Sequence, residues 1–413
     1  MEVFQQLGDE IWGQWRRRNF RYDDFAELAC EALGRRPPSR EVSSADVLRW
    51  VATTPSLPPQ FDLSARFGQP PISVYRRDAI HIDVLFWTSS TTTIHQHAFD
   101  GAFHVLDGSS LHCEYEFAER ERLCAWVKLG SLRRASYERL ARGDVRPIRA
   151  GQSFIHSLFH LDNPSVSVVV RTNENPLAGP QFNYYPPGLA IDPFFQEPAF
   201  ERRRQVLHLL LQLDDGRAEG WFEEVIGRAN EVEALRWADH LATLTELAGA
   251  AGETAAALVE RAYRAVPRLE GVLREAGRQR ARTMHVSQLR AAVKDPHHRW
   301  FLALVLNLDR RRDIFRAVAE RYPGERPEDK VCGWLTELAR PLPEGGTLLG
   351  FEISDAALEA VGLLLRGATP GDVIEGLRAK FGGRASDIGA EQLRDFLEGL
   401  REEPIFDVLM RHE

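Results

Sequence analysis

Hydrophobic positions near the N-terminus recur three and four residues apart, which is the spacing of one face of an α-helix. The pattern covers "FAELACEAL" (25–33) and "ADVLRWVA" (45–52). Ser44 directly precedes the second run and is the expected N-cap of that helix. "PSLPPQFDL" (55–63) then breaks the pattern and is typical of a linker. Residues 1–60 are therefore predicted to form a helical segment.

A shorter period begins at about residue 70 and continues to about residue 195. "AIHIDVLFW", "AFHVLDG", "LHCEYEFA" and "SVSVVVRT" are short, rich in β-branched and aromatic residues, and bounded by Gly, Ser, Asn and Pro. Several such strands at short intervals are typical of a sandwich or a barrel. Residues 61–196 are therefore predicted to form a β domain.

Helical spacing returns from about residue 197, in runs such as "RRQVLHLLLQL", "TAAALVERAYRAV" and "HRWFLALVLNL". Residues 197–345 are therefore predicted to form an all-α domain. The last part, 346–413, contains short helical runs joined by glycine-bearing turns, and it is predicted to be a small helical module of winged-helix-like type. The predicted fold class is α+β, with N-terminal helices, a β domain and a large all-α C-terminal part.

Composition and charge restrict the class of protein. The chain has 413 residues, of which 44% are hydrophobic and 27% charged, as in soluble globular proteins. A net charge of −8 argues against nucleic acid as a partner. No apolar stretch reaches the roughly 18 residues of a membrane span, and the N-terminus lacks the apolar core of a secretory signal. The four cysteines have no CxxC spacing, which indicates reduced thiols and a cytoplasmic location.

Histidines are concentrated in the β region, where seven of the thirteen lie between residues 81 and 160. In "IHQH", His95 and His97 are two residues apart, so on a strand both side chains point the same way. Such a pair is either two arms of a metal site or two polar residues on the wet face of a strand. A third ligand must come from another segment, and "SFIHSLFH" offers His156 and His160.

These two segments together resemble the paired motifs of the cupin superfamily. The first motif is His-x-His, a short gap, usually Glu, six residues and Gly; His95, His97 and Gly108 occupy those places. The second contains a proline and a glycine, then His, and usually Asn four residues later; His156 and His160 stand there. The resemblance implies a double-stranded β-barrel, or jelly roll, over residues 61–196. It also implies that His95, His97 and His156 bind a divalent metal.

The usual glutamate ligand of the first motif is missing, because Gly101 stands in its place, with six residues between it and Gly108. Asp100, next to it, is expected to point to the other side of the strand. A three-histidine site without this carboxylate resembles the thiol dioxygenases, and the likeness covers roughly residues 72–190. It implies Fe(II) as the cofactor, with another divalent metal as the alternative, and dioxygen as a co-substrate.

The resemblance also implies residues that bind the substrate. Arg76 or Arg77 matches the arginine that holds the substrate carboxylate in that family, and Trp87 follows before "IHQH". The alternative for both arginines is a solvated charge at the end of a strand. His160 and Arg171 complete the substrate-binding candidates.

A Ser-x-His-x-Tyr run of the thiol dioxygenases is only partly present, as Ser167, Val169 and Arg171. Ser167 keeps its place, and Tyr184 or Tyr185 in "FNYYPPG" is the candidate replacement for the phenol. These three hydroxyl-bearing residues are the catalytic candidates. The remaining histidines of the region, His81, His104 and His112, are expected to have packing or structural roles.

The predicted function is that of a non-haem iron oxygenase acting with dioxygen on a small thiol, amino acid or carboxylate-bearing substrate, free or linked to a carrier or peptide. One alternative is a non-catalytic cupin that binds a small ligand and regulates a partner. Another is a 2-oxoglutarate-dependent hydroxylase. That class usually has a His-x-Asp/Glu pair, whereas the corresponding pair here is His95 and His97. The helical part is expected to form a homodimer or to bind a protein or peptide.

Overall fold

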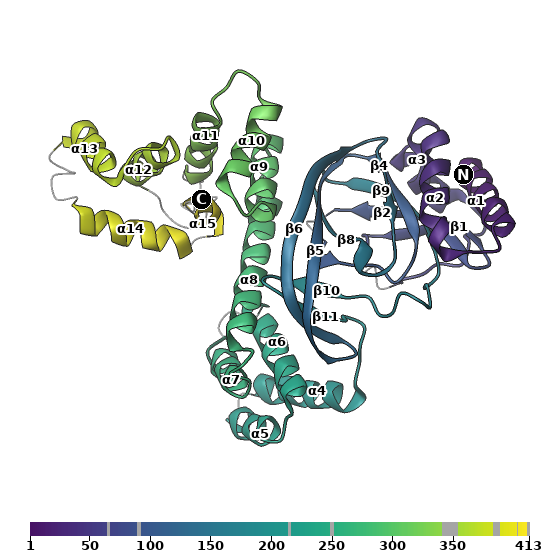
Figure 1. Cartoon of the computed structure of the whole chain (residues 1–413), viewed down its shortest axis with the longest axis horizontal. Coiled ribbons are helices and arrows are strands. Elements are labelled where there is room, and N and C mark those ends of the chain that lie inside the picture. The colour runs from purple at the N-terminus through teal and green to yellow at the C-terminus, as the bar shows by residue number, and fades with distance from the viewer. Residues whose placement is uncertain are drawn as a thin grey trace. The chain divides into compact units, whose positions relative to one another are not determined.

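The computed structural model describes residues 1–63, 67–88, 92–213, 216–247, 252–340, 354–382, 389–402 and 404–410. They form two compact units, Met1–Ala281 and Arg282–Glu413, whose boundary lies within helix α8 (Glu270–Ala292). The fold is mixed, with antiparallel β-sheets followed by many helices (Figure 1). The α+β class that the sequence predicts is therefore confirmed at this level.

The N-terminal segment packs its apolar side chains on the outer face of one sheet. It contains α1 (Glu2–Arg17), α2 (Phe25–Arg35) and α3 (Ser44–Thr53), with short 3-10 turns η1 (Tyr22–Asp24) and η2 (Pro38–Arg40). Leu7 and Ile11 of α1 and Leu28 of α2 lie in one buried cluster with strand residues. The prediction of Ser44 as N-cap is wrong by one residue. The Ser43 hydroxyl accepts a hydrogen bond from Asp46 N (3.2 Å), and the Asp46 carboxylate accepts one from Ser43 N (3.0 Å).

The strands of the first unit pair in two antiparallel groups. In chain order they are β1 (Pro71–Arg77), β2 (Ile80–Trp87), β3 (Ile94–His95), β4 (Gly101–Asp107), β5 (Ser109–Cys124), β6 (Val127–Ala141), β7 (Val145–Ile148), β8 (Ile155–His160), β9 (Ser165–Thr172), β10 (Asn183–Tyr185) and β11 (Leu189–Ile191). The first sheet has the order β1-β2-β9-β4-β7. In the second group, β10, β11, β6, β5, β8 and β3 pair in a closed ring.

Alternation along the first sheet separates its core face from its functional face. On β9, Val166, Val168 and Val170 join the cluster under the N-terminal helices. The residues that alternate with them, Ser167, Val169 and Arg171, face the opposite way and line a cavity. The same alternation explains why "IHIDVLFW" places isoleucine on one face of β2 and polar residues on the other.

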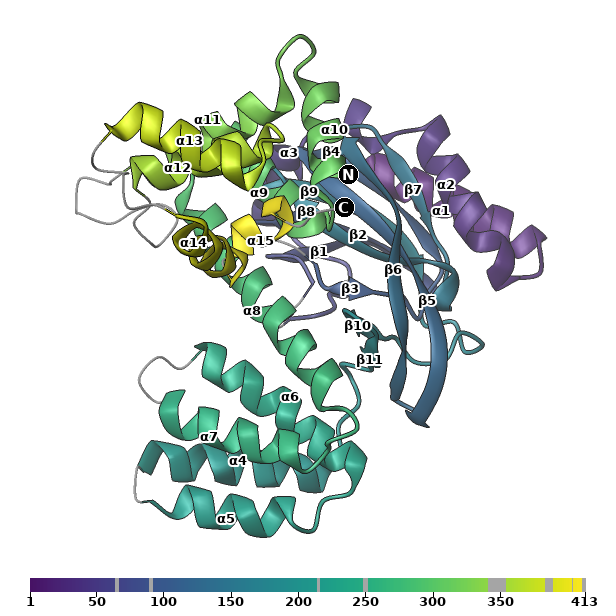
Figure 2. The same cartoon turned by 60° about the vertical axis from the view of Figure 1, so that its left-hand side comes forward.

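Helices make up the rest of the described chain. In the first unit, α4 (Pro198–Leu213), α5 (Arg217–Ile226), α6 (Glu231–Leu247) and α7 (Gly252–Arg264) lie side by side (Figure 2). Phe222 and Trp237 are in their buried core. The second unit contains α9 (Pro296–Asn307), α10 (Arg311–Arg321), α11 (Pro327–Ala339), α12 (Asp355–Leu365), α13 (Pro370–Phe381), α14 (Ala390–Glu402) and α15 (Pro404–Met410).

The C-terminal module is helical in 354–382, 389–402 and 404–410. The segments 341–353 and 383–388, where a β wing of a winged helix would have to lie, are outside the described residues. None of the described helices combines the length and the apolar character that a membrane crossing requires.

Candidate metal centre and ligand cavity

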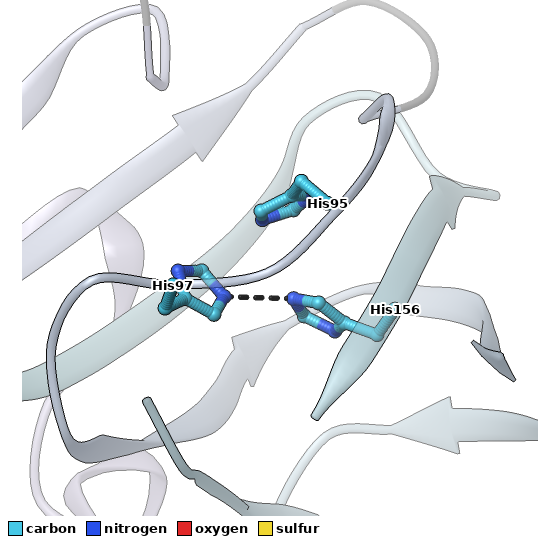
Figure 3. A group of neighbouring side chains, drawn as sticks. All are labelled: His95, His97 and His156. Carbon is cyan, nitrogen blue, oxygen red and sulfur yellow. Dashed lines mark hydrogen bonds between the residues drawn. The ribbon is translucent and has the colours of Figure 1, made fainter. Parts of the chain in front are cut away.

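His95, His97 and His156 come together from the end of β3, the segment that follows it, and β8 (Figure 3). His95 ends β3 and pairs directly with His156 of β8, and His97 lies two residues further along the chain. His97 Nε2 and His156 Nε2 are 2.9 Å apart. One nitrogen from each of the three rings lies within 4.8 Å of the others. The side chains predicted to be metal ligands are therefore gathered at one point.

The spacing of these nitrogens fits one metal ion. Two imidazole nitrogens about 2.1 Å from one ion, with bonds at a right angle, are about 3 Å apart. The separation of 2.9 Å between His97 Nε2 and His156 Nε2 is close to this value. Imidazole suits iron, zinc, copper and nickel, whereas magnesium and calcium prefer oxygen ligands. The donor set therefore fits a divalent transition metal.

Burial keeps the three imidazoles in the form that binds a metal. It lowers the pKa of His95 to about 4. Burial also lowers the pKa values of His97 and His156 well below the ordinary range, and repulsion from neighbouring imidazoles adds to this effect. A neutral imidazole has a free lone pair, which is what a metal ion requires.

Hydrogen bonds set the tautomer of His95. Its Nδ1–H donates to the Thr93 carbonyl oxygen at 2.8 Å. The lone pair is therefore on Nε2.

A chain of hydrogen bonds sets the tautomer of His156. The Glu138 carboxylate can only accept, so His112 Nδ1–H donates to it at 3.1 Å. His112 Nε2 then accepts from His156 Nδ1–H at 3.1 Å, which leaves the lone pair of His156 on Nε2, facing His97. Arg146 pairs with both oxygens of Glu138. His112 was expected to have only a packing or structural role, and nothing in the sequence indicates its contact with the candidate metal ligand His156.

The backbone at Gly101 leaves no room for the missing fourth ligand. A Cβ atom at this position would lie 2.2 Å from the Val170 carbonyl oxygen of the neighbouring strand. Asp100 is turned to other partners, because its carboxylate accepts hydrogen bonds from Ala150 N (3.0 Å) and Asn175 Nδ2 (2.7 Å). In the part of the chain that the structure describes, no carboxylate joins the three histidines.

The three histidines line a cavity of about 840 Å³ between the two groups of strands. Much of its wall is aromatic, formed by Phe61, Phe67, Trp87, Phe99, Phe103 and Phe194. Its polar side chains include Ser73, His81, Asp83, Ser167, Arg171, Asn173 and Asn175. The candidates Trp87, Ser167 and Arg171 thus share one cavity with the candidate ligands.

The structure places Arg76 and Arg77 outside this lining. Arg77 forms an ion pair with Asp9 of α1 (3.0 Å), and its guanidinium lies 3.7 Å from the centre of the Trp12 ring. Arg76 is exposed and lies over Phe61 (4.3 Å). The arginine that reaches the cavity is Arg171.

The two tyrosines are also elsewhere. Tyr184 pairs with Ile94 across the strands, so it faces away from His95, and its hydroxyl donates to Gln96. Tyr185 packs among residues of the helical core. Neither phenol belongs to the cavity lining as described.

His160 lies behind the wall of the cavity. Its ring stacks on Trp87 with centres 4.6 Å apart, and Nδ1 is 2.9 Å from the Ser110 hydroxyl oxygen. It does not line the cavity, so it supports Trp87 rather than meeting a ligand.

An antiparallel β domain with a buried three-histidine cluster is the class of protein that this geometry defines. No protein-family model matches the chain, and no curated protein matches it. Among solved structures it is similar to a cupin-2 domain protein from Shewanella frigidimarina, with 12% identity over 33% of this chain and 98% of that chain and a TM-score of 0.20. Hydroquinone 1,2-dioxygenase from Sphingomonas sp. TTNP3 shows 13% identity over 28% and 72%, with a TM-score of 0.21. Similarity at this level gives no information about the activity of the chain.

Proposed function

We propose that this chain is a non-haem iron enzyme that acts with dioxygen on a small carboxylate-bearing compound. One observation carries the proposal: three buried neutral imidazoles, without a carboxylate among the described residues, converge on the wall of a large cavity. The two antiparallel groups of strands that line this cavity support a cupin-like barrel. Three nitrogen ligands leave about three positions of an octahedral ion for substrate and dioxygen.

Ferrous iron would supply dioxygen binding and one-electron chemistry at His95, His97 and His156. The residues of the chain would bind the substrate and exclude water. Arg171 lines the same cavity, where its guanidinium can pair with a carboxylate. The aromatic wall would keep water from the reacting groups, and the Ser167 hydroxyl would be available as a hydrogen-bond donor.

Metal analysis of protein purified without oxygen tests the ligand assignment. We expect about one ion per chain in the parent and little in His95→Ala and His156→Ala. His104→Ala is the matched control, because His104 is fully buried but lies outside the three-histidine group. Parent-like metal content in the His95 and His156 variants would show that the assignment is wrong.

Oxygen uptake by the iron-loaded parent, measured against a panel of small carboxylic acids and thiols, tests the activity. Uptake with one class of acid supports the proposal. Ligand binding without uptake would favour the non-catalytic alternative, and uptake that requires 2-oxoglutarate would favour the hydroxylase.

A further inference from the structure

A second group of polar side chains, on strands of the first sheet, lines the same cavity as the three histidines. Ser73 of β1 is paired with Asp83 of β2, and His81 of β2 is paired with Arg171 of β9. Paired residues of antiparallel strands share one face, so these four side chains are neighbours. All four line the cavity. None of them is a candidate metal ligand.

Hydrogen bonds within this group leave one acceptor open. The Ser73 hydroxyl donates to Asp83 Oδ1 (2.7 Å), and His81 Nε2 lies 3.3 Å from Asp83 Oδ2. Burial alone would raise the pKa of Asp83, but these contacts more than offset it and lower the pKa. The ionised carboxylate can only accept, so in the neutral imidazole form of His81 the proton is on Nε2. The lone pair is then on His81 Nδ1, which is buried and has no partner among the described residues.

Arg171, next to His81, provides a positive charge that no described carboxylate contacts directly. Its side chain is partly buried, with its guanidinium carbon 3.9 Å from the centre of the Phe99 ring. No described carboxylate oxygen lies within 4.0 Å of its guanidinium nitrogens, although the charges of Asp83 and Glu174 act on it from a greater distance. Removing a charge from water is unfavourable unless an opposite charge replaces the lost hydration. Arg171 is therefore suited to binding an anion that enters the cavity.

The position of Phe99 connects this group with the three histidines. Its ring centre is 4.5 Å from that of His97 and 3.9 Å from the Arg171 guanidinium carbon. The guanidinium carbon can thus lie no further from the His97 ring than the sum of these distances. A small molecule held by Arg171 would reach the candidate metal centre.

We propose that Arg171 and His81 form a recognition site for acids that carry a hydrogen-bond donor on the carbon next to the carboxylate. Arg171 pairs with the carboxylate, and His81 Nδ1 accepts a hydrogen bond from the adjacent hydroxyl or amino group. Asp83 and Ser73 position His81, and the aromatic wall receives the apolar remainder of the molecule. This inference rests on the proposed function only in taking the cavity as the substrate site.

Calorimetric titration of the full chain with three probes tests the site: phenyllactate, phenylalanine and 3-phenylpropionate, which lacks the donor. A neutral hydrogen bond contributes about 0.5–1.5 kcal/mol, so we expect the parent to prefer phenyllactate or phenylalanine by about 2- to 12-fold. The two donor-bearing probes distinguish a hydroxyl from an amino group. Equal affinities for all three in the parent would overturn the proposal.

Variants separate the two interactions. His81→Phe should remove the preference while leaving binding of 3-phenylpropionate near the parent value. Asp83→Asn should also remove it, because its amide can donate to Nε2 and move the His81 proton to Nδ1. Arg171→Gln should weaken all three probes by about 10- to 100-fold. His104→Phe is the control for loss of a buried histidine.

Persistence of the preference in both His81→Phe and Asp83→Asn would refute the inference, and the second variant serves if the first does not fold. The titrations require neither metal nor turnover. If the protein shows the preference but takes up no oxygen, the proposed oxidation is refuted and the recognition site is supported. If it takes up oxygen but shows no preference, the recognition site is refuted and the oxidation is supported.

Discussion

Replacing His112 with phenylalanine is expected to weaken metal binding although it removes no ligand. His112 Nε2 accepts the hydrogen bond from His156 Nδ1–H, and phenylalanine offers no acceptor in its place. His156 is buried, so the freed donor has no access to bulk water. The imidazole can relieve this by moving its proton to Nε2, which is the nitrogen that must hold the metal.

The structure sets the size of the effect. A buried donor left without its acceptor costs about 1–3 kcal/mol. If that cost falls on the tautomer of His156 that has its lone pair on Nε2, the dissociation constant of the metal rises by about 5- to 150-fold. The range agrees with the 10- to 100-fold losses of affinity that are common when the partner of a metal-binding histidine is removed. Glu138→Gln should have a smaller effect, because the amide oxygen still accepts from His112.

The assay is a chelator competition that measures the dissociation constant of Co(II) or Zn(II), without any turnover. His104→Phe is the matched control, since it also removes a fully buried imidazole and its hydrogen bond from Ser39 N (3.3 Å). This control should be less stable than the parent but bind metal equally well. A parent-like constant in His112→Phe, or an equal loss in His104→Phe, would refute the reasoning.

Two further predictions concern burial and backbone packing. The lowered pKa of His95 means that the unfolded chain binds a proton that the folded chain does not, so stability is full above about pH 6.5 and is lost as the pH falls toward 4. Urea denaturation of metal-free protein should show a loss of about 3 kcal/mol from this residue, and unfolding free energies that are equal at pH 7 and pH 4.5 would contradict it. Gly101→Ala should lower stability by at least about 1–3 kcal/mol, because its methyl group would meet a backbone oxygen at 2.2 Å. Gly220→Ala is the control and should not lower stability, because nothing lies within 4 Å of the new methyl group. A parent-like denaturation midpoint for Gly101→Ala would count against the packing argument.

Local spacing together with one resemblance between motifs was enough to predict the three-histidine group. His95 and His97 share a face because side chains alternate along an extended chain. His156 came from a second motif, and the register places it directly opposite His95. Arg171 follows from the same alternation, since it lies two steps of the strand from Ser167. These relations depend only on neighbours along the chain or on one resemblance between motifs.

Residues whose roles depend on packing between distant segments could not be predicted in this way. Arg77 stands near the strand that leads to the histidines, but α1 packs against it and supplies Asp9. His112 meets His156 only because β5 pairs with β8. His81 resembles any buried histidine until the register places Arg171 beside it. Hydrophobic periodicity contains no information about such cross-strand registers.

One row of cross-strand pairs contains both Gly101, where the fourth ligand is missing, and Arg171 of the proposed recognition site. Gly101 of β4 is paired with Arg171 of β9, which is paired in turn with His81 of β2. A glutamate at position 101 would share a face with Arg171 and stand within reach of its guanidinium. It would then neutralise the charge that is free to bind a ligand. Because the Val170 carbonyl oxygen excludes any side chain at Gly101, the same close approach of β4 and β9 keeps the candidate metal centre free of a carboxylate and leaves Arg171 available for an anion from outside the protein.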